Sequence, residues 1–194
     1  TVLNTLNMNM YPLMKIIKEE LNEDWSFEDV LKFAAYPGMK VMEELNIKDK
    51  EKTYARWVQY VNEYEEGASL YPGFEEIFEA FDGSIIQAVA SAKTTAQYQI
   101  DFVDKGLDQY MQVAILADDT DKHKPDPEPL FECLKRINVK PSEAIYIGDA
   151  LSDYLASQNA HMDFGYAKWG SVSSKGIDEP TYIFETPLEL LKLL

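Results

Sequence analysis

The chain has 194 residues, with 34 acidic and 18 basic side chains, and its formal net charge is −16. Such an acidic chain disfavours nucleic acid and anionic membrane surfaces as partners, because both repel it at long range. No apolar run approaches the ~20 residues of a membrane span, and no signal peptide is visible. The single cysteine, Cys133, excludes an intramolecular disulfide and lies in an apolar helical pattern typical of a buried thiol. These features favour a cytoplasmic globular protein.

Residues 1–5 have the composition of a loop, and helical patterns then dominate up to about residue 66. Ser26, followed three residues later by Asp29, predicts a capped helix start. Tyr36-Pro37-Gly38 is expected to break that helix near Ala35. The expected helices in this part are 8–21, 26–35, 39–45 and 50–64. No stretch of this part has a convincing strand pattern, so residues 8–67 are interpreted as an inserted all-helical domain.

After residue 67 helical and strand patterns alternate. The expected strands are 85–90, 112–117, 144–147, 163–167 and 182–184, and the expected helices are 74–81, 94–103, 127–137, 152–160 and 187–193. The run 85–90 has the continuous apolar pattern of a strand buried on both faces. This alternation predicts an α/β fold with a doubly wound parallel sheet, formed by residues 1–7 and 68–194. Such a body should begin with a strand before the helical insert, and the sequence shows none there.

Polar residues follow two of the expected strands. Ser91, in Ser91-Ala92-Lys93, lies where a hydroxyl and a helix N-terminus can donate to an anion such as phosphate. It could equally be a simple helix cap. Lys124, in Lys124-Pro125-Asp126-Pro127, is a point charge held between rigid residues. The alternative is a solvated basic turn, in which the neighbouring His123 is exposed.

The most specific pattern is the run from Ile145 to Asp153, in which a short apolar strand ends at Gly148-Asp149. Asp153 begins the next helix, so both carboxylates can face one point. Hard oxygen ligands without histidine or cysteine suit Mg²⁺ better than zinc. The alternative is that Asp153 caps the helix and Asp149 starts a turn. Ser91, Lys124 and this acidic pair follow successive strands, so they should converge on one edge of the sheet.

These motifs, in this order, resemble those of the haloacid dehalogenase superfamily, in particular its phosphoglycolate phosphatase-like branch with a helical cap. Ser91 matches the second family motif, Lys124 the third, and Gly148-Asp149 with Asp153 the fourth, in its GDxxxD form. Tyr71-Pro72-Gly73-Phe74 resembles the return from cap to core. Thr1-Val2-Leu3-Asn4-Thr5 resembles the tail of the first motif, DxDGT. The nucleophilic and acid/base aspartates of that motif are therefore expected just upstream of residue 1.

The resemblance implies a Mg²⁺-dependent phosphatase that acts through an aspartyl phosphate. Ser91 would bind the phosphoryl group, with Ala92, Lys93 and Thr1 as further phosphate-binding residues. Lys124 would neutralise charge, Asp149 would bind Mg²⁺, and Asp153 would support the metal or orient Lys124. The cap would close over the site, and its cations Lys15, Lys40 and Arg56 either reach the substrate or are surface charges. The substrate is expected to be a small phosphorylated metabolite, and the protein a monomer or homodimer.

Three alternatives remain open at this point. A phosphosugar mutase of the same fold would return the phosphate to a sugar instead of releasing it. A carbon–halogen dehalogenase is disfavoured, because Asp149 and Asp153 supply a metal site that it does not need. A non-catalytic binding module with a relic site is supported only by the missing nucleophile.

Overall fold

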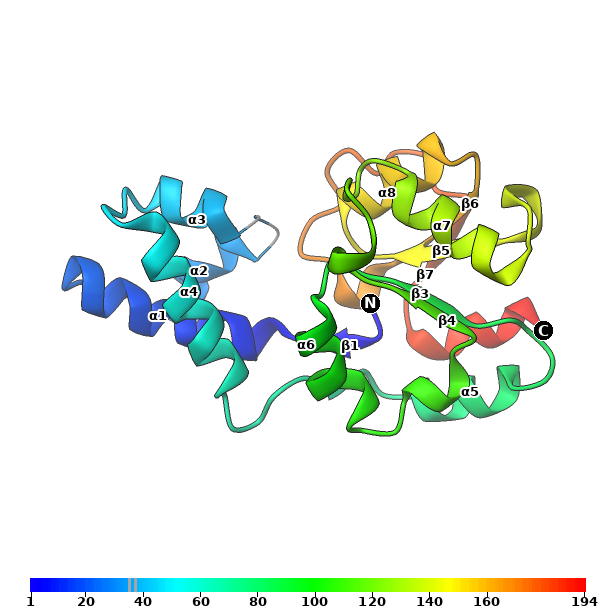
Figure 1. Ribbon diagram of the computed structural model, residues 1–194, viewed down its shortest axis with the longest axis horizontal. Coiled ribbons are helices and arrows are strands. Elements are labelled where there is room, and N and C mark those ends of the chain that lie inside the picture. The colour runs from blue at the N-terminus through cyan, green and yellow to red at the C-terminus, as the bar shows by residue number, and fades with distance from the viewer. Residues whose placement is uncertain (35, 37) are drawn as a thin grey trace. The chain divides into compact units, whose positions relative to one another are not determined.

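A computed structural model describes residues 1–34, 36 and 38–194, and the chain divides into two compact units (Figure 1). Unit 1 comprises Thr1–Val2 with Tyr71–Leu194, and unit 2 comprises Leu3–Leu70. The role of residues 8–67 as a cap domain remains a prediction. Among the described residues, no helix is long and apolar enough to cross a membrane.

Unit 2 consists of helices and one short pair of strands. Its helices are α1 Leu6–Leu21, α2 Phe27–Val30 with a 3₁₀ extension Leu31–Phe33, α3 Gly38–Glu44 and α4 Lys50–Asn62. The capping box is confirmed, since Ser26 Oγ accepts from the Asp29 N–H at 3.2 Å and the Asp29 carboxylate accepts from the Ser26 N–H at 2.8 Å. The predicted helix end at Ala35 and the break at Pro37 lie outside the described residues.

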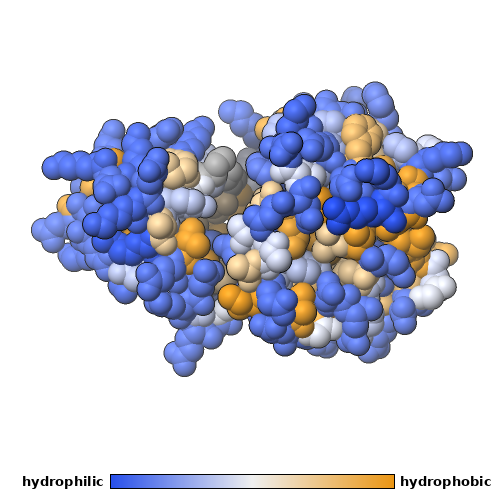
Figure 2. Space-filling model, in the orientation of Figure 1, coloured by the Kyte–Doolittle hydropathy of each residue, from blue (hydrophilic) through white to orange (hydrophobic). Residues whose placement is uncertain are grey.

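The core of unit 2 is apolar. Leu13, Ile16 and Ile17 on α1 have no exposed surface, and Trp57 on α4 packs in the same cluster. The visible surface of the helical unit is mostly hydrophilic (Figure 2), in keeping with the acidic composition. The loop expected over residues 1–5 is wrong in part, because β1 (Leu3–Asn4) pairs antiparallel with β2 (Ser69–Leu70). That pairing depends on a partner far along the chain, which local patterns do not show.

Unit 1 alternates strands and helices. Its strands are β3 Ala88–Ala90, β4 Val113–Ile115, β5 Ile145–Gly148, β6 Asp163–Ala167 and β7 Tyr182–Phe184. Its α-helices are α5 Phe74–Phe81, α6 Thr95–Tyr98, α7 Glu128–Ile137 and α8 Leu151–Asn159. A π-helical turn, Gln99–Val103, continues α6, and 3₁₀ turns cover Asp108–Tyr110, Ala117–Asp119, Pro141–Glu143, Lys168–Gly170 and Pro187–Leu193.

The strands of unit 1 are parallel. β3 pairs with β4, with Ala90 opposite Ile115, and a second sheet has the order β5-β6-β7. Helix α7 packs on β3 and β4, and α8 packs on β5 and β6. These two helices lie on one side of the strands, and α5 with the C-terminal 3₁₀ segment lies on the other (Figure 1). The predicted α/β architecture with parallel strands covered on both faces is confirmed.

Three local predictions for unit 1 need correction. The strand over 85–90 is shorter and is not buried on both faces, because Ile86 is 51% exposed and Gln87 is the buried residue, donating to the Phe78 carbonyl. The strand over 112–117 ends at Ile115, where Asp119 accepts from the Leu116 N–H and tightens the chain into a 3₁₀ turn. The closing helix over 187–193 is a 3₁₀ helix, closed by bonds such as Glu189 N–H to the Thr186 carbonyl.

Candidate active site

The Ser91 hydroxyl lies directly after β3. Its backbone N–H continues the parallel ladder to the Ile115 carbonyl at 2.9 Å, and its Oγ accepts the backbone N–H of Lys93 at 3.2 Å. Because that oxygen is already an acceptor, its own O–H proton remains available to a ligand. The residue is partly buried, and Ala92 beside it is exposed. The turn therefore presents one oriented hydroxyl donor at the carboxyl end of β3.

At least two of the first backbone donors of the helix that follows are bonded within the protein. Thr94 caps α6 by accepting the Gln97 N–H at 3.3 Å, and Asp118 accepts the Thr95 N–H at 2.7 Å. The Lys93 side chain forms an ion pair with Asp101, on the π-helical turn that continues α6. The Ser91 hydroxyl is therefore the side-chain donor that this motif offers to a ligand, and phosphate binding by Ala92 and Lys93 stays a prediction.

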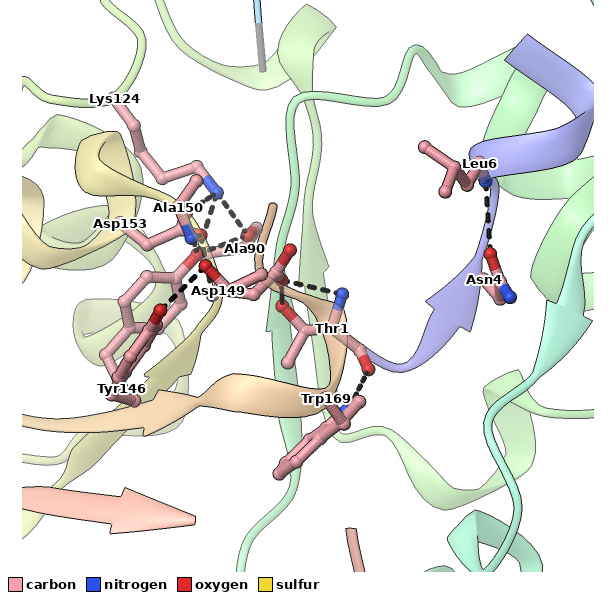
Figure 3. A network of polar contacts seen from close by, with 12 residues as sticks. Thr1, Asn4, Leu6, Ala90, Lys124, Tyr146, Asp149, Ala150, Asp153 and Trp169 are labelled. Carbon is pink, nitrogen blue, oxygen red and sulfur yellow. Dashed lines mark hydrogen bonds and ion pairs between the residues drawn. The ribbon is translucent and has the colours of Figure 1, made fainter. Parts of the chain in front are cut away.

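Lys124 reaches the same edge from the turn before α7. Its Nζ donates to Asp153 Oδ1 at 2.6 Å, to the Tyr146 hydroxyl at 2.8 Å and to the Ala90 carbonyl at 3.4 Å (Figure 3). The side chain is only 14% exposed, so the surface-turn interpretation does not describe it, whereas His123 beside it is exposed as expected. One ammonium thus joins the carboxyl ends of β3 and β5.

Asp153 holds this ammonium and also closes the loop after β5. Its Oδ2 accepts the backbone N–H groups of Asp149 at 3.3 Å and Ala150 at 3.1 Å. Gly148 permits this close approach, because a Cβ there would lie 2.5 Å from the Cβ of Asp153. The Asp153 side chain therefore both caps the start of α8 and orients Lys124.

Asp149 points toward the first residue of the chain. Its Oδ1 lies 2.8 Å from the Thr1 amino nitrogen and also accepts from the Thr1 hydroxyl. The Thr1 carbonyl accepts from Trp169 Nε1 at 2.8 Å (Figure 3), on the 3₁₀ turn after β6. Gly170 faces the same carboxylate, and a Cβ there would lie 3.2 Å from Asp149 Oδ2. Thr1, Asp149 and the Trp169-Gly170 turn therefore form one side of the site.

The electrostatics favour ionised groups at this site. Burial alone would lower the pKa of Lys124, but the Tyr146 hydroxyl and the Asp153 carboxylate outweigh it, and that pKa is raised. Burial acts to raise the pKa of Asp149, whereas the Thr1 hydroxyl and the Lys124 ammonium act to lower it. Burial raises the pKa of Tyr146, so its hydroxyl is neutral. A lysine cation and an aspartate anion thus lie at one strand edge at neutral pH.

Three residues of this region were not identified from the sequence. Tyr146 is hidden inside the apolar strand 144–147, although a tyrosine two residues before Gly148 is a polar signal in an otherwise apolar run. Trp169 follows a strand directly, in a Lys-Trp-Gly turn that could have been noticed. Asp101 gives no local signal, because its partner depends on how α6 turns.

The three cations of unit 2 singled out in the sequence have partners within that unit. Arg56 forms ion pairs with Glu19 and Glu20. Lys15 Nζ lies 3.7 Å from the centre of the Tyr60 ring, and Lys40 Nζ lies 4.6 Å from that of Tyr36. These partners favour the interpretation of surface charges.

Several known proteins are similar to this chain in sequence or in fold. The family described as haloacid dehalogenase-like hydrolase matches residues 1–167. Pyrophosphatase PpaX of Bacillus mycoides is 22% identical over 200 residues, covering 100% of this chain and 92% of the relative. The crystal structure of a candidate phosphoglycolate phosphatase from Lactobacillus plantarum is 26% identical, with a TM-score of 0.90 and coverage of 100% and 94%. A β-phosphoglucomutase from Clostridium difficile shares the fold, with 16% identity, a TM-score of 0.75 and coverage of 98% and 88%.

The parallel α/β fold and the match to a family of hydrolases together define the chain as a hydrolase. More specifically, the chain belongs to the haloacid dehalogenase-like hydrolase family.

Proposed function

We propose that the protein is a Mg²⁺-dependent phosphatase that hydrolyses a small phosphate monoester, such as phosphoglycolate, through an aspartyl phosphate. The observation that carries this proposal is the Lys124 ammonium, which is fixed by Asp153 at 2.6 Å beside the Ser91 turn and Asp149. Phosphoryl transfer depends mainly on positioning and charge neutralisation, and these groups supply both. The names of the relatives also support a phosphatase, since they include a pyrophosphatase and a candidate phosphoglycolate phosphatase.

Ser91 and Lys124 would act directly on the phosphoryl group. The Ser91 hydroxyl donates to one phosphoryl oxygen, because the Lys93 N–H already occupies its acceptor side. Lys124 now uses its three N–H donors on protein acceptors, and the 3.4 Å contact to the Ala90 carbonyl is the longest. That donor is the one Lys124 would turn to the substrate, while Asp153 and Tyr146 keep the ammonium in place.

The residues fit a magnesium ion at Asp149. Its carboxylate is partly exposed and faces Gly170, where the missing Cβ leaves room. Mg²⁺ is commonly held by one or two carboxylates, with water and phosphate oxygens completing the shell. Bound there, it would neutralise charge on the phosphoryl oxygens. Both Asp153 oxygens already accept N–H donors, so Asp153 would support the ion indirectly, through Lys124 and the Asp149 backbone.

In this proposal the nucleophilic aspartate comes from a segment preceding Thr1. The Thr1 nitrogen lies 2.8 Å from Asp149 Oδ1 and would donate to it as an ammonium or as an amide N–H. A segment preceding Thr1 would therefore begin beside the carboxylate proposed to bind Mg²⁺. Thr1 would keep its hydroxyl contact to Asp149 and contribute its backbone to the phosphate site.

A product-resolved substrate screen tests the proposal. The protein, including the segment proposed to precede Thr1, is incubated with phosphoglycolate, pyrophosphate and several sugar phosphates, with Mg²⁺ or with EDTA, and free phosphate is measured. The proposal expects Mg²⁺-dependent release from phosphoglycolate or a similar monoester. Release from pyrophosphate alone would show that the substrate is a pyrophosphate and not a phosphate monoester. No release from any compound would contradict the proposed function.

The phosphosugar mutase is the second candidate, and the shared fold with a β-phosphoglucomutase keeps it in the test. In the same reactions, formation of a sugar phosphate isomer without free phosphate would favour the mutase. If the intact mass of the native protein corresponds to a polypeptide that begins at Thr1, and no phosphoryl transfer is detected, the non-catalytic binding module would be favoured.

A further inference from the structure

A buried ion pair lies behind the Ser91 turn. Asp101 is 3% exposed, and its carboxylate pairs with Lys93 Nζ, whose side chain is 24% exposed. The roles proposed above for Ser91 and Lys124 do not use Asp101. Removing a carboxylate from water costs several kcal/mol unless it is paired, and Lys93 supplies that pair here.

Asp101 is placed by an irregular turn of helix. Residues Gln99–Val103 form a π-helical turn, in which the Asp104 N–H bonds to the Gln99 carbonyl five residues back at 2.9 Å. Asp101 is its central residue. Such turns insert one extra residue into a helix and occur frequently at functional sites. Here the turn carries an acidic side chain into the interior, toward Lys93.

Lys93 in turn is fixed at three points. Its backbone N–H donates to Ser91 Oγ at 3.2 Å, its carbonyl accepts from the Ala117 N–H at 2.9 Å, and its Nζ pairs with Asp101. The first contact occupies one lone pair of the Ser91 oxygen and so restricts the directions in which the hydroxyl can donate. The ion pair with Asp101 restrains Lys93, the residue whose N–H donates to Ser91 Oγ. A continuous path of contacts thus runs from Asp101 to the Ser91 hydroxyl.

We propose that Asp101 is a positioning residue for Ser91, acting through its ion pair with Lys93. The inference rests on the proposed function, because it assigns Asp101 a part in aligning the hydroxyl that binds the phosphoryl group. In this proposal the backbone N–H of Lys93 orients Ser91, and the ion pair with Asp101 holds Lys93 in place. The Lys93 ammonium does not bind the phosphate.

A double-mutant cycle with Ser91 separates positioning from simple stability. Hydrolysis of p-nitrophenyl phosphate by the protein that includes the segment proposed to precede Thr1 is measured for wild type, Asp101→Asn, Ser91→Ala and the double variant. Asp101→Asn should lower kcat/KM about tenfold in the wild type and less than about twofold in the Ser91→Ala background. A purely structural role would lower kcat/KM by the same factor in both backgrounds, and that result would overturn the inference.

Two further variants complete the design. Lys93→Met keeps the backbone donor to Ser91 and removes the charge, so it should repeat the Asp101→Asn pattern and carries the test if Asp101→Asn does not fold. Glu132→Gln breaks a surface ion pair with Arg136 at 2.9 Å and should leave kcat/KM unchanged. If Ser91→Ala keeps wild-type activity, the proposed function itself fails. If Ser91→Ala is impaired but the cycle is additive, only the role of Asp101 fails.

Discussion

Replacing Lys124 by methionine removes the charge at the centre of the site and keeps most of the side-chain volume. The ammonium lies 2.6 Å from Asp153 Oδ1, and the two side chains are 14% and 9% exposed. Removing one partner of a buried pair typically costs roughly 3–5 kcal/mol, because the other charge is left without compensation. Asp153 keeps its two backbone N–H donors, so we expect the lower end, about 3 kcal/mol.

This free energy translates into measurable changes. For a chain of 194 residues, each kcal/mol shifts Tm by roughly 2–4 °C, so Lys124→Met should melt roughly 6–12 °C lower. Loss of a charge that stabilises the transition state should lower kcat by about 10²–10³. Thermal unfolding followed by circular dichroism and steady-state phosphate release measure the two effects at a temperature where the variant is folded.

The matched control is Lys168→Met. Lys168 pairs with Glu185 at 2.6 Å, but its side chain is 43% exposed, and exposed pairs contribute only about 0–1 kcal/mol. It should therefore change neither Tm nor kcat appreciably. If Lys124→Met behaved like Lys168→Met in both measurements, the reasoning about the buried pair would be refuted.

The other predictions concern the acidic loop and the buried thiol. Asp149→Asn should abolish Mg²⁺-dependent phosphate release with an unchanged circular dichroism spectrum; activity near wild type across a Mg²⁺ titration would exclude Asp149 as the ligand. Gly148→Ala should lower Tm by several degrees, because the new Cβ would lie 2.5 Å from the Asp153 Cβ; an unchanged melting curve would contradict that close approach. Burial raises the pKa of Cys133 to about 11, so its thiol should react far more slowly with a disulfide reagent at pH 8 in the native protein than in urea. Because the unfolded thiol ionises first, at about pH 8.5, the same pKa shift should reduce the stability of the protein above that pH. Equal thiol reaction rates in the native protein and in urea would argue against the raised pKa.

The sequence was most informative where one local rule decided the structure. Helix α5 at Phe74–Phe81 and strand β6 at Asp163–Ala167 have the predicted bounds, because a clear apolar period and flanking turn residues agree there. The capping box at Ser26 was likewise visible, since both partners lie within four residues. Strand β1 was not, because its pairing with Ser69–Leu70 is set by tertiary structure.

The site shows the same division. The order of Ser91, Lys124 and Asp149 after successive strands predicted their convergence, and contacts through Ala90 and Asp153 link them. The sequence left open whether Asp153 supports the metal or orients Lys124. In the structure both of its carboxylate oxygens already accept N–H donors, and this favours the second role. The sequence also could not show that Lys93 turns to Asp101, because a π-helical turn has no dependable sequence signal.

The most direct test of the central claim is phosphate release by the protein that includes the segment proposed to precede Thr1, with Mg²⁺ and with EDTA, beside the Ser91→Ala variant. If the carboxyl ends of β3 and β5 hold a phosphoryl-transfer site, hydrolysis should require Mg²⁺ and should fall by about 10²-fold or more when the Ser91 hydroxyl is removed. Hydrolysis that persists in EDTA, or that is equal in wild type and Ser91→Ala, would contradict the account.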